Sequence, residues 1–199
     1  MVIGITLNEV LREFTPRFEY VYNKYIDEVE YDSDDIKSLN LLDYFKFDSV
    51  DELNKFLYIE AALEVFGHAE PMYDNIMKHF NLFLNDIKDD EEHQIKIISR
   101  EILKSKPATL FFLSKLSCEA DDITFVQNHE DKWDYVDVLI TANPKALETK
   151  PAGKISVKIN ASYNKNSDAD FELDSIVDFF KDESLRDKIL NTKITTFEN

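Results

Sequence analysis

The sequence predicts an α/β protein whose parallel sheet has helices on both faces. Two features favour this class: short apolar runs alternate with helical segments, and one long helical block separates the first run from the second. Of the 199 residues, 44% are hydrophobic and 13% are aromatic. That content is enough to bury a core, and it excludes disorder over the whole length.

Short apolar runs predict about five strands. They lie at residues 2–7, 95–99, 123–126, 136–140 and 154–159. The first run is uncharged and predicts a buried strand, whereas the last alternates polar and apolar residues, as a half-exposed strand does. Strands that alternate with helices pair in parallel, so the expected sheet is Rossmann-like.

Capping signals mark the expected helix starts. Thr15 and Pro16 fit an N-cap followed by proline at the first helical position. Residues 49–52 fit a capping box, and Asn143 precedes Pro144 at the start of another short helix. Apolar spacing predicts the remaining helices at 72–87, 107–116 and 176–190.

The helical block after the first strand predicts a division into two parts. Residues 1–16 and 93–199 would form the Rossmann-like core, and residues 17–92 would form a mainly helical, cap-like insertion. Within the insertion, an acidic stretch at 27–52 is expected to be irregular, and residues 89–92 are expected to form a solvated acidic turn.

The chain is strongly acidic, with 40 Asp and Glu against 23 Lys and Arg and a formal net charge of −17. Such a surface repels phosphate backbones and anionic lipids, so we expect no direct nucleic-acid ligand and no membrane partner. The charge fits either solubility alone or docking to a basic surface of another protein. Both interpretations stay open at this point.

Glycine and cysteine usage exclude further classes. Only three glycines occur, so the glycine-rich loops that bind nucleotide phosphates are absent. The single cysteine, Cys118, cannot form an intramolecular disulfide or a thiolate zinc site by itself, and this usage is typical of a reducing cytoplasm.

Polar residues follow the expected strands in a particular order. The frame is Thr6-x-Asn8-x-x-Leu11 after the first strand, Ser99 at the end of the second, Lys132 before the fourth, and Thr141-Ala142 at its end. This order resembles the haloacid dehalogenase-like phosphohydrolases, most closely the small 5′-deoxynucleotidase-like branch of bacteria and their phages. That family has Asp-x-Asp-x-x-Leu, a Ser or Thr, a Lys, and one or two Asp at these places, with a cap inserted between its first two strands.

Departures from the family pattern predict a loss of chemistry. The resemblance places the nucleophilic Asp at Thr6 and the acid–base Asp at Asn8, and neither side chain replaces a carboxylate at neutral pH. It places the acids that anchor Mg²⁺ at Thr141 and Ala142, so we expect no metal and no other cofactor. No catalytic residue is expected at these four positions.

Ser99 and Lys132 occupy the positions that bind phosphate in the family, so they could still hold an anion such as phosphate or sulfate. The alternative is that Ser99 caps a helix and that Lys132 is a surface lysine or half of an ion pair. Next to them, Trp133 and Tyr135 are candidates either for the core or for anchoring a partner protein.

Three further groups of acids and histidines have competing interpretations. Glu9 could be a displaced catalytic acid, or it could bond a nearby donor at a helix entrance. His68 and Glu70 could supply two ligands of a metal site that has no third ligand nearby in sequence. Acids alternate with apolar residues over 168–174, which fits a solvated strand or turn better than a cation-binding loop.

Two function classes follow from these expectations. The first is a catalytically inactive module with a structural or interaction role, most concretely a neck, tail or capsid-associated protein of a tailed-phage virion. The resemblance, the glycine-poor composition and an expected ordered segment at 195–198 motivate that setting, with basic neighbouring subunits as partners. The second class is a phosphohydrolase that acts on deoxynucleoside monophosphates through a rewired site. The expected location is the virion for a phage protein and the cytoplasm otherwise.

Overall fold

The computed structural model describes residues 1–29, 35–87 and 92–192. Part of the acidic stretch (30–34), most of the predicted turn at 89–92 and the segment at 195–198 lie outside these residues. Within the described part, no helix is long and apolar enough to cross a membrane.

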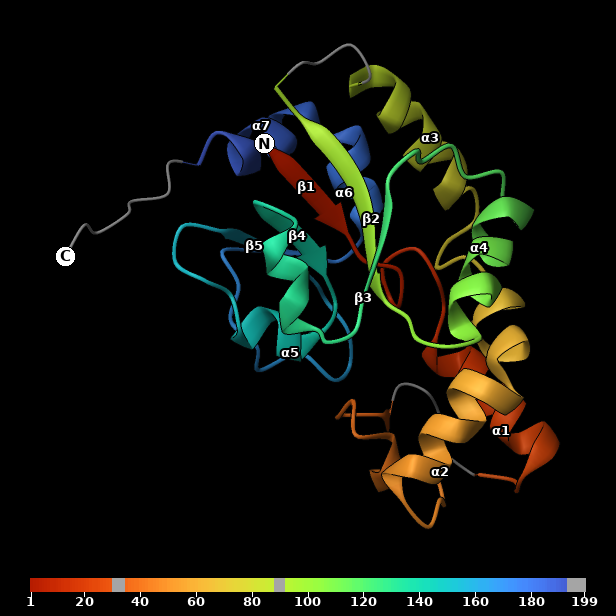
Figure 1. Cartoon of the computed structure of the whole chain (residues 1–199). Helices are drawn as coiled ribbons and strands as arrows, with labels where there is room; N and C mark the ends of the chain where they lie inside the picture. The colour runs from red at the N-terminus through yellow and green to blue at the C-terminus, as the bar shows by residue number, and fades with distance from the viewer. Residues whose placement is uncertain (30–34, 88–91, 193–199) are drawn as a thin grey trace.

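Six parallel strands form one sheet at the centre of the molecule (Figure 1). They are β1 (Val2–Ile5), β2 (Gln94–Arg100), β3 (Ile123–Val126), β4 (Val138–Thr141), β5 (Ile155–Ile159) and β6 (Phe171–Leu173). Their spatial order is β3-β2-β1-β4-β5-β6, so the direction of winding reverses between β1 and β4. The predicted Rossmann-like α/β fold is confirmed.

The sixth strand, β6, lies in the stretch of alternating acids at 168–174, where a strand or turn was expected. Glu172 in β6 forms an ion pair with Lys158 of β5 at 2.9 Å, and Asp170 accepts a hydrogen bond from Lys150 at 2.7 Å. Asp170 also accepts the Ser156 N–H at 2.8 Å. These acids hold the edge of the sheet, which explains why this short run joins it.

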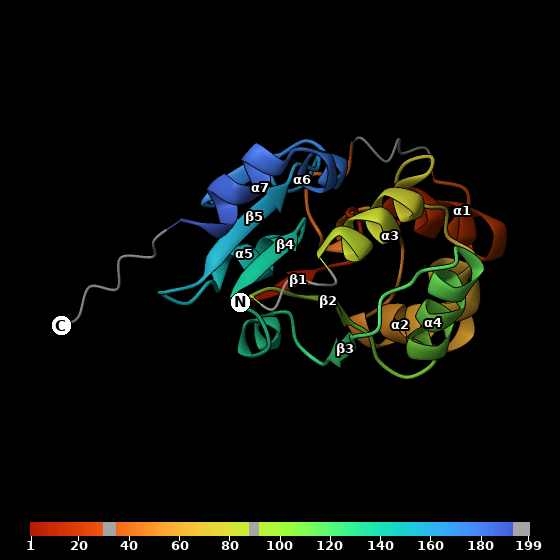
Figure 2. The same cartoon turned by 90° about the horizontal axis from the view of Figure 1, so that it is seen from above.

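Different helices cover the two faces of the sheet, as predicted (Figure 2). On one face lie α3 (Ile76–Ile87), α6 (Ile176–Lys181) and α7 (Glu183–Leu190), where the rings of Phe83 and Phe180 stack with centroids 5.1 Å apart. On the other face, the 3₁₀ helix η5 (Glu130–Asp134) and α5 (Pro144–Glu148) enclose a smaller cluster. Trp133 belongs to that cluster and donates to the Ala146 carbonyl at 2.7 Å, whereas Tyr135 is 48% exposed.

The insertion between β1 and β2 packs in two separate places. Its first part comprises α1 (Thr15–Tyr25), η2 (Leu41–Asp43), α2 (Val50–Lys55), η3 (Phe56–Glu60) and η4 (Leu63–Gly67). These elements share an aromatic core of their own and are called the cap below. Helix α3, in contrast, packs on the sheet. Of the insertion expected over 17–92, the cap therefore ends at Gly67. Figure 1 shows α1 and α2 beyond the carboxyl ends of the central strands.

The helix that starts at the predicted capping box does not continue as an α-helix. Ser49 accepts the Glu52 N–H at 3.2 Å as expected, but η3 and η4 are π-helices. The Ala61 N–H bonds to the Phe56 carbonyl and the His68 N–H to the Leu63 carbonyl, both in the i→i+5 pattern. The wider turns bring the rings of Tyr58 and Phe66 face to face, 5.7 Å apart. A short α-helix followed by two π-helices thus replaces the continuous helix predicted from the apolar spacing.

Candidate functional site

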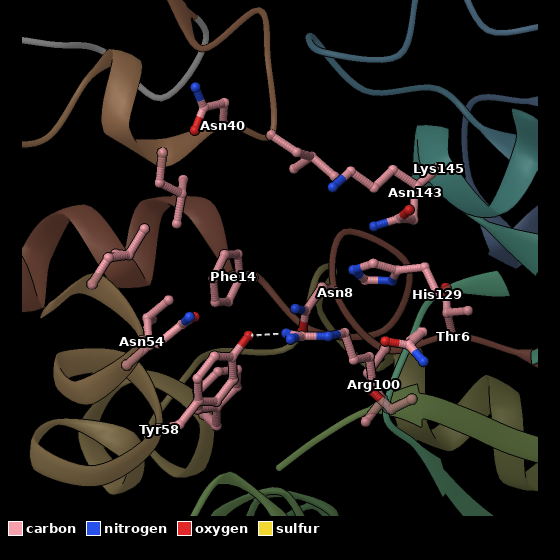
Figure 3. Close-up of a pocket in the computed structure, with 18 of the residues that line it drawn as sticks. Thr6, Asn8, Phe14, Asn40, Asn54, Tyr58, Arg100, His129, Asn143 and Lys145 are labelled. Carbon is pink, nitrogen blue, oxygen red and sulfur yellow. Dashed lines mark hydrogen bonds between the residues drawn. The ribbon is translucent and has the colours of Figure 1, made fainter. Parts of the chain in front are cut away.

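A cavity of about 460 Å³ lies between the cap and the carboxyl ends of β1, β2 and β4. Its core wall contains Thr6, Asn8, Ser99 and Lys132, all four singled out by the sequence. Figure 3 labels Thr6 and Asn8 among them. The chain brings them together because β1 lies between β2 and β4, where the strand order reverses. This crevice is where parallel α/β sheets bind their ligands.

Thr6, which lines the cavity, bonds to Thr141, which is fully buried behind it. The hydroxyl oxygens of Thr6 and Thr141 are 3.2 Å apart and hydrogen-bonded, although the two residues are 135 positions apart in the chain. The Thr6 N–H donates to the Ile140 carbonyl at 3.0 Å, which draws the end of β1 against β4. Ala142 is fully buried in the core of the sheet. These positions therefore present two mutually bonded hydroxyls and a methyl group.

Asn8 is held by Arg12, a fully buried residue that sequence reasoning missed. Arg12 Nε and Nη2 both donate to Asn8 Oδ1, at 3.0 Å and 2.6 Å. Because the amide oxygen accepts both bonds, the Asn8 amide group turns its Nδ2 away from the guanidinium. Little in the sequence signals its burial, because Arg12 is followed directly by another charged residue, Glu13.

Glu101 neutralises Arg12 and also engages Ser99. Its Oε1 accepts from Arg12 at 2.8 Å, from Thr109 at 2.9 Å and from the Ser99 hydroxyl at 3.2 Å. A serine has one hydroxyl proton, so Ser99 turns its lone pairs, rather than its O–H, towards the cavity. Ser99 also does not cap α4 (Ser105–Lys115), which starts further along the chain.

Lys132 is buried, with 3% of its surface exposed, so it is not the surface lysine that the sequence left as an alternative. Its Nζ lies 3.1 Å from Nδ1 of His129, and within the described chain no carboxylate pairs with it. Burial lowers the pKa of Lys132 to about 8, against a smaller opposing attraction from Glu101. Burial, reinforced by the charge of Lys132, lowers the pKa of His129 to about 3. At pH 7 the histidine is neutral and the lysine still carries most of its charge.

Two further cations reach the cavity, Arg100 from β2 and Lys145 from α5. Arg100 donates to the Gln127 carbonyl at 2.9 Å and to the hydroxyl of Tyr58 in the cap. Lys145 is exposed, and Figure 3 shows its side chain extending into the cavity. Among the described lining residues, Glu130 is the one acid.

The cap wall of the cavity is mostly apolar. It is lined by the side chains of Phe14, Leu41, Leu53, Leu57 and Phe66, with the amides Asn40 and Asn54 beside them. The cavity therefore has a cationic end at the sheet and an apolar end at the cap. A ligand that matches both ends is an anion with an apolar or planar body.

Glu9 does not line the cavity in the described structure. Its Oε1 accepts the Thr15 N–H at 2.7 Å, and burial raises the pKa of its carboxyl group. The residue at the N-cap position of α1 is Phe14, so the prediction of Thr15 as N-cap was wrong. Glu9 performs that capping from outside the helix, which agrees with the expectation that it bonds a nearby donor.

His68 and Glu70, raised from the sequence as two possible metal ligands, belong to no metal-binding cluster in the described residues. The His68 ring packs against Phe111, with centroids 5.3 Å apart. Across residues 1–29, 35–87 and 92–192, no three His, Cys, Asp or Glu side chains lie close enough together to hold a metal ion.

Comparison with known proteins supports the fold. No protein-family model and no curated protein matches the chain. Among solved structures, it is similar to a protein classified as a haloacid dehalogenase-like hydrolase from Burkholderia xenovorans LB400, with a TM-score of 0.55 and 10% sequence identity. The match covers 92% of this chain and 96% of that one. The chain thus has a haloacid dehalogenase-like fold, as the order of its motifs indicated, and this likeness extends to the fold alone.

Proposed function

We propose that this protein is a catalytically inactive haloacid dehalogenase-like protein that binds an anion without a metal ion and serves as an interaction module. The observation that carries the proposal is the hydroxyl pair of Thr6 and Thr141 at 3.2 Å. By the resemblance, these positions would hold the nucleophile and an acid that anchors Mg²⁺. Two neutral hydroxyls that bond each other are a poor nucleophile and weak ligands for a hard cation.

The charge of the core wall supports anion binding. Lys132 is a buried cation that lacks a carboxylate partner in the described residues, and burying an unpaired charge costs free energy that a bound anion would offset. Asn8 adds a neutral donor, because Arg12 occupies its oxygen and leaves Nδ2 free to donate. An anion at this place therefore meets a cation and an N–H group.

Calorimetric titration with inorganic phosphate, in EDTA and then in Mg²⁺, tests the binding. We expect equal affinity in both, because the four positions at which the resemblance places acids are Thr6, Asn8, Thr141 and Ala142, none of which carries a carboxylate to hold the ion. Asn8→Asp replaces the donor by a carboxylate oxygen and should weaken phosphate binding about tenfold or more. Asn54→Asp is the matched control, since it adds the same charge on the cap wall. Equal losses in both variants would contradict the role of Asn8.

Turnover assays test the absence of catalysis. With Mg²⁺, we expect no phosphate release from deoxynucleoside monophosphates or from a generic phosphate ester. The Thr6→Asp/Asn8→Asp double variant is assayed in parallel with the natural protein. This assay tests whether restoring the two acids restores turnover. Release by the natural protein that disappears in Lys132→Ala would establish a phosphohydrolase with a rewired site and overturn the proposal.

We further propose the tailed-phage virion as the setting of this module, with its acidic surface docked on basic subunits. The support is the resemblance, the glycine-poor composition and the net charge of −17. Mass spectrometry of purified particles from the source phage is the direct check. A stable monomer that is absent from particles and binds no virion protein would contradict this setting.

A further inference from the structure

We propose that the ligand of this cavity carries two phosphate groups, and that His129, Asn143 and Lys145 form a second anion subsite beside the one at Lys132. The inference rests on the proposed function and names its ligand class, a bisphosphorylated small molecule. The three residues come from the segment before η5 and from the start of α5, and Figure 3 shows them on the same side of the cavity.

His129 is fixed as a hydrogen-bond donor towards the cavity. Its Nδ1 lies 3.1 Å from the Lys132 ammonium, which has only protons to offer, so Nδ1 accepts. A neutral ring that accepts at Nδ1 carries its proton on Nε2. Burial first, and then the charges of Lys132, Arg100 and Lys145, hold the pKa of His129 near 3 and keep the ring neutral. The ring that lines the cavity is therefore an N–H donor surrounded by cations.

Asn143 is oriented in the same way. Its side-chain oxygen accepts the Ala146 N–H at 3.1 Å, so its Nδ2 is the group left to donate. Asn143 lines the cavity next to Lys145, whose amino group makes no ion pair within the described residues. Each of the three side chains thus offers a donor to the cavity, and the acceptor atoms of His129 and Asn143 are already occupied. Such a set suits an oxyanion.

The second subsite adjoins the first through His129. Its Nδ1 lies 3.1 Å from the Lys132 ammonium, and its ring lines the same cavity as Asn143 and Lys145. Lys145 is exposed, whereas Lys132 is buried, so the cavity has one cation at its buried wall and another that reaches it from the surface. At about 460 Å³, the cavity is also larger than one phosphate group needs and has the size of small-molecule sites.

Calorimetric titration with adenosine 5′-monophosphate and adenosine 3′,5′-bisphosphate tests this inference on the whole protein. These two probes differ only in the second phosphate. We expect the bisphosphate to bind about tenfold more tightly, as one charge-assisted site would give. In Lys145→Gln this ratio should fall to about two, while the affinity for inorganic phosphate changes less than about threefold. Lys106→Gln, an exposed lysine of α4 outside the cavity, removes the same charge and should keep the ratio.

The possible failures separate the two proposals. Equal affinities for the two nucleotides, or a ratio that Lys145→Gln leaves unchanged, would overturn the second subsite while phosphate binding stands. No binding of phosphate or of either nucleotide would overturn both. As a second readout, the ¹⁵N–¹H signal of His129 Nε2 should shift more with the bisphosphate than with the monophosphate, because only the second phosphate would contact the Nε2 proton directly, whereas a phosphate at Lys132 acts on the ring through Nδ1.

Discussion

One buried cation lines the cavity, Lys132, and another, Arg12, lies behind it and holds Asn8, and the surroundings of these two cations differ sharply. Arg12 is fully buried and donates to Asn8, the Phe66 carbonyl, Thr109 and Glu101. Lys132 is almost as buried, yet its ammonium group bonds only to a neutral histidine among the described residues. A buried charge whose donors all have hydrogen-bond partners is typical of a structural role. A buried charge without a counter-ion is typical of a site that binds an anionic ligand.

Both cations depend on the same carboxylate, Glu101. Its Oε1 accepts from Arg12, and its attraction partly offsets the effect of burial on the pKa of Lys132. Its Oε2 makes no hydrogen bond within the described residues. Glu101 therefore satisfies Arg12 directly and Lys132 only at a distance, and substitutions at these residues should separate a structural charge from a ligand-binding one.

Breaking the ion pair of Arg12 and Glu101 should cause the largest change in the free energy of unfolding. Arg12→Leu leaves Glu101 buried without its partner, so the free energy of unfolding should fall by about 3–5 kcal/mol. Urea denaturation measures the change. In Arg12→Leu/Glu101→Leu the unpaired charge is gone, and a good part of the loss should be recovered. A double variant no more stable than Arg12→Leu would show that the pair acts through packing, not through charge.

Removing the unpaired cation Lys132 should instead raise the free energy of unfolding. Lys132 has a pKa of about 8 in the folded protein and an ordinary value of 10.5, so the unfolded chain binds more protons between these values. The free-energy cost of burying the charged ammonium group is fully present below pH 8, and it disappears as the pH rises towards 10.5. Lys132→Met should therefore raise the free energy of unfolding at pH 7 by up to about 3 kcal/mol, since each pKa unit corresponds to about 1.4 kcal/mol.

The pH profile is the check on this second prediction. The difference between the natural protein and Lys132→Met should shrink as the pH rises from 8 to 10.5, because both proteins then lack the buried charge. Lys106→Met, which changes an exposed lysine, should leave the unfolding free energy unchanged at every pH. A Lys132→Met protein that is less stable at pH 7 would mean that the charge already has a counter-ion.

The smallest change in the free energy of unfolding is expected for the hydrogen bond between Tyr58 of the cap and Arg100 of the core. Tyr58→Phe removes the hydroxyl that accepts from Arg100 but keeps the ring stacked on Phe66. The free energy of unfolding should fall by about 1 kcal/mol, the usual contribution of one hydrogen bond. Urea denaturation can resolve this change. A loss as large as that of Arg12→Leu would place the main cap–core attachment at Tyr58 instead.

Much of the fold could be predicted because its signals are local. Apolar runs located five strands, and the order Thr6, Asn8, Ser99, Lys132 was enough to expect these residues at one edge of the sheet. For the three-residue strand β6 the sequence left a strand or a turn open, because its acids gain partners only from β5 and the segment before it. The π-helices were missed because the apolar spacing after the capping box also fits an α-helix.

The sequence by itself determined the chemistry that is possible at each position: no carboxylate at Thr6, Asn8, Thr141 or Ala142, and a net charge of −17. Only the tertiary structure decided which charges are buried and which partners they have. Arg12 and Glu101 are 89 positions apart, and the sequence left open whether Lys132 binds an anion or lies on the surface. Burial and pairing are properties of a place in the fold, so the cationic pocket could be recognised only once the strands were assembled.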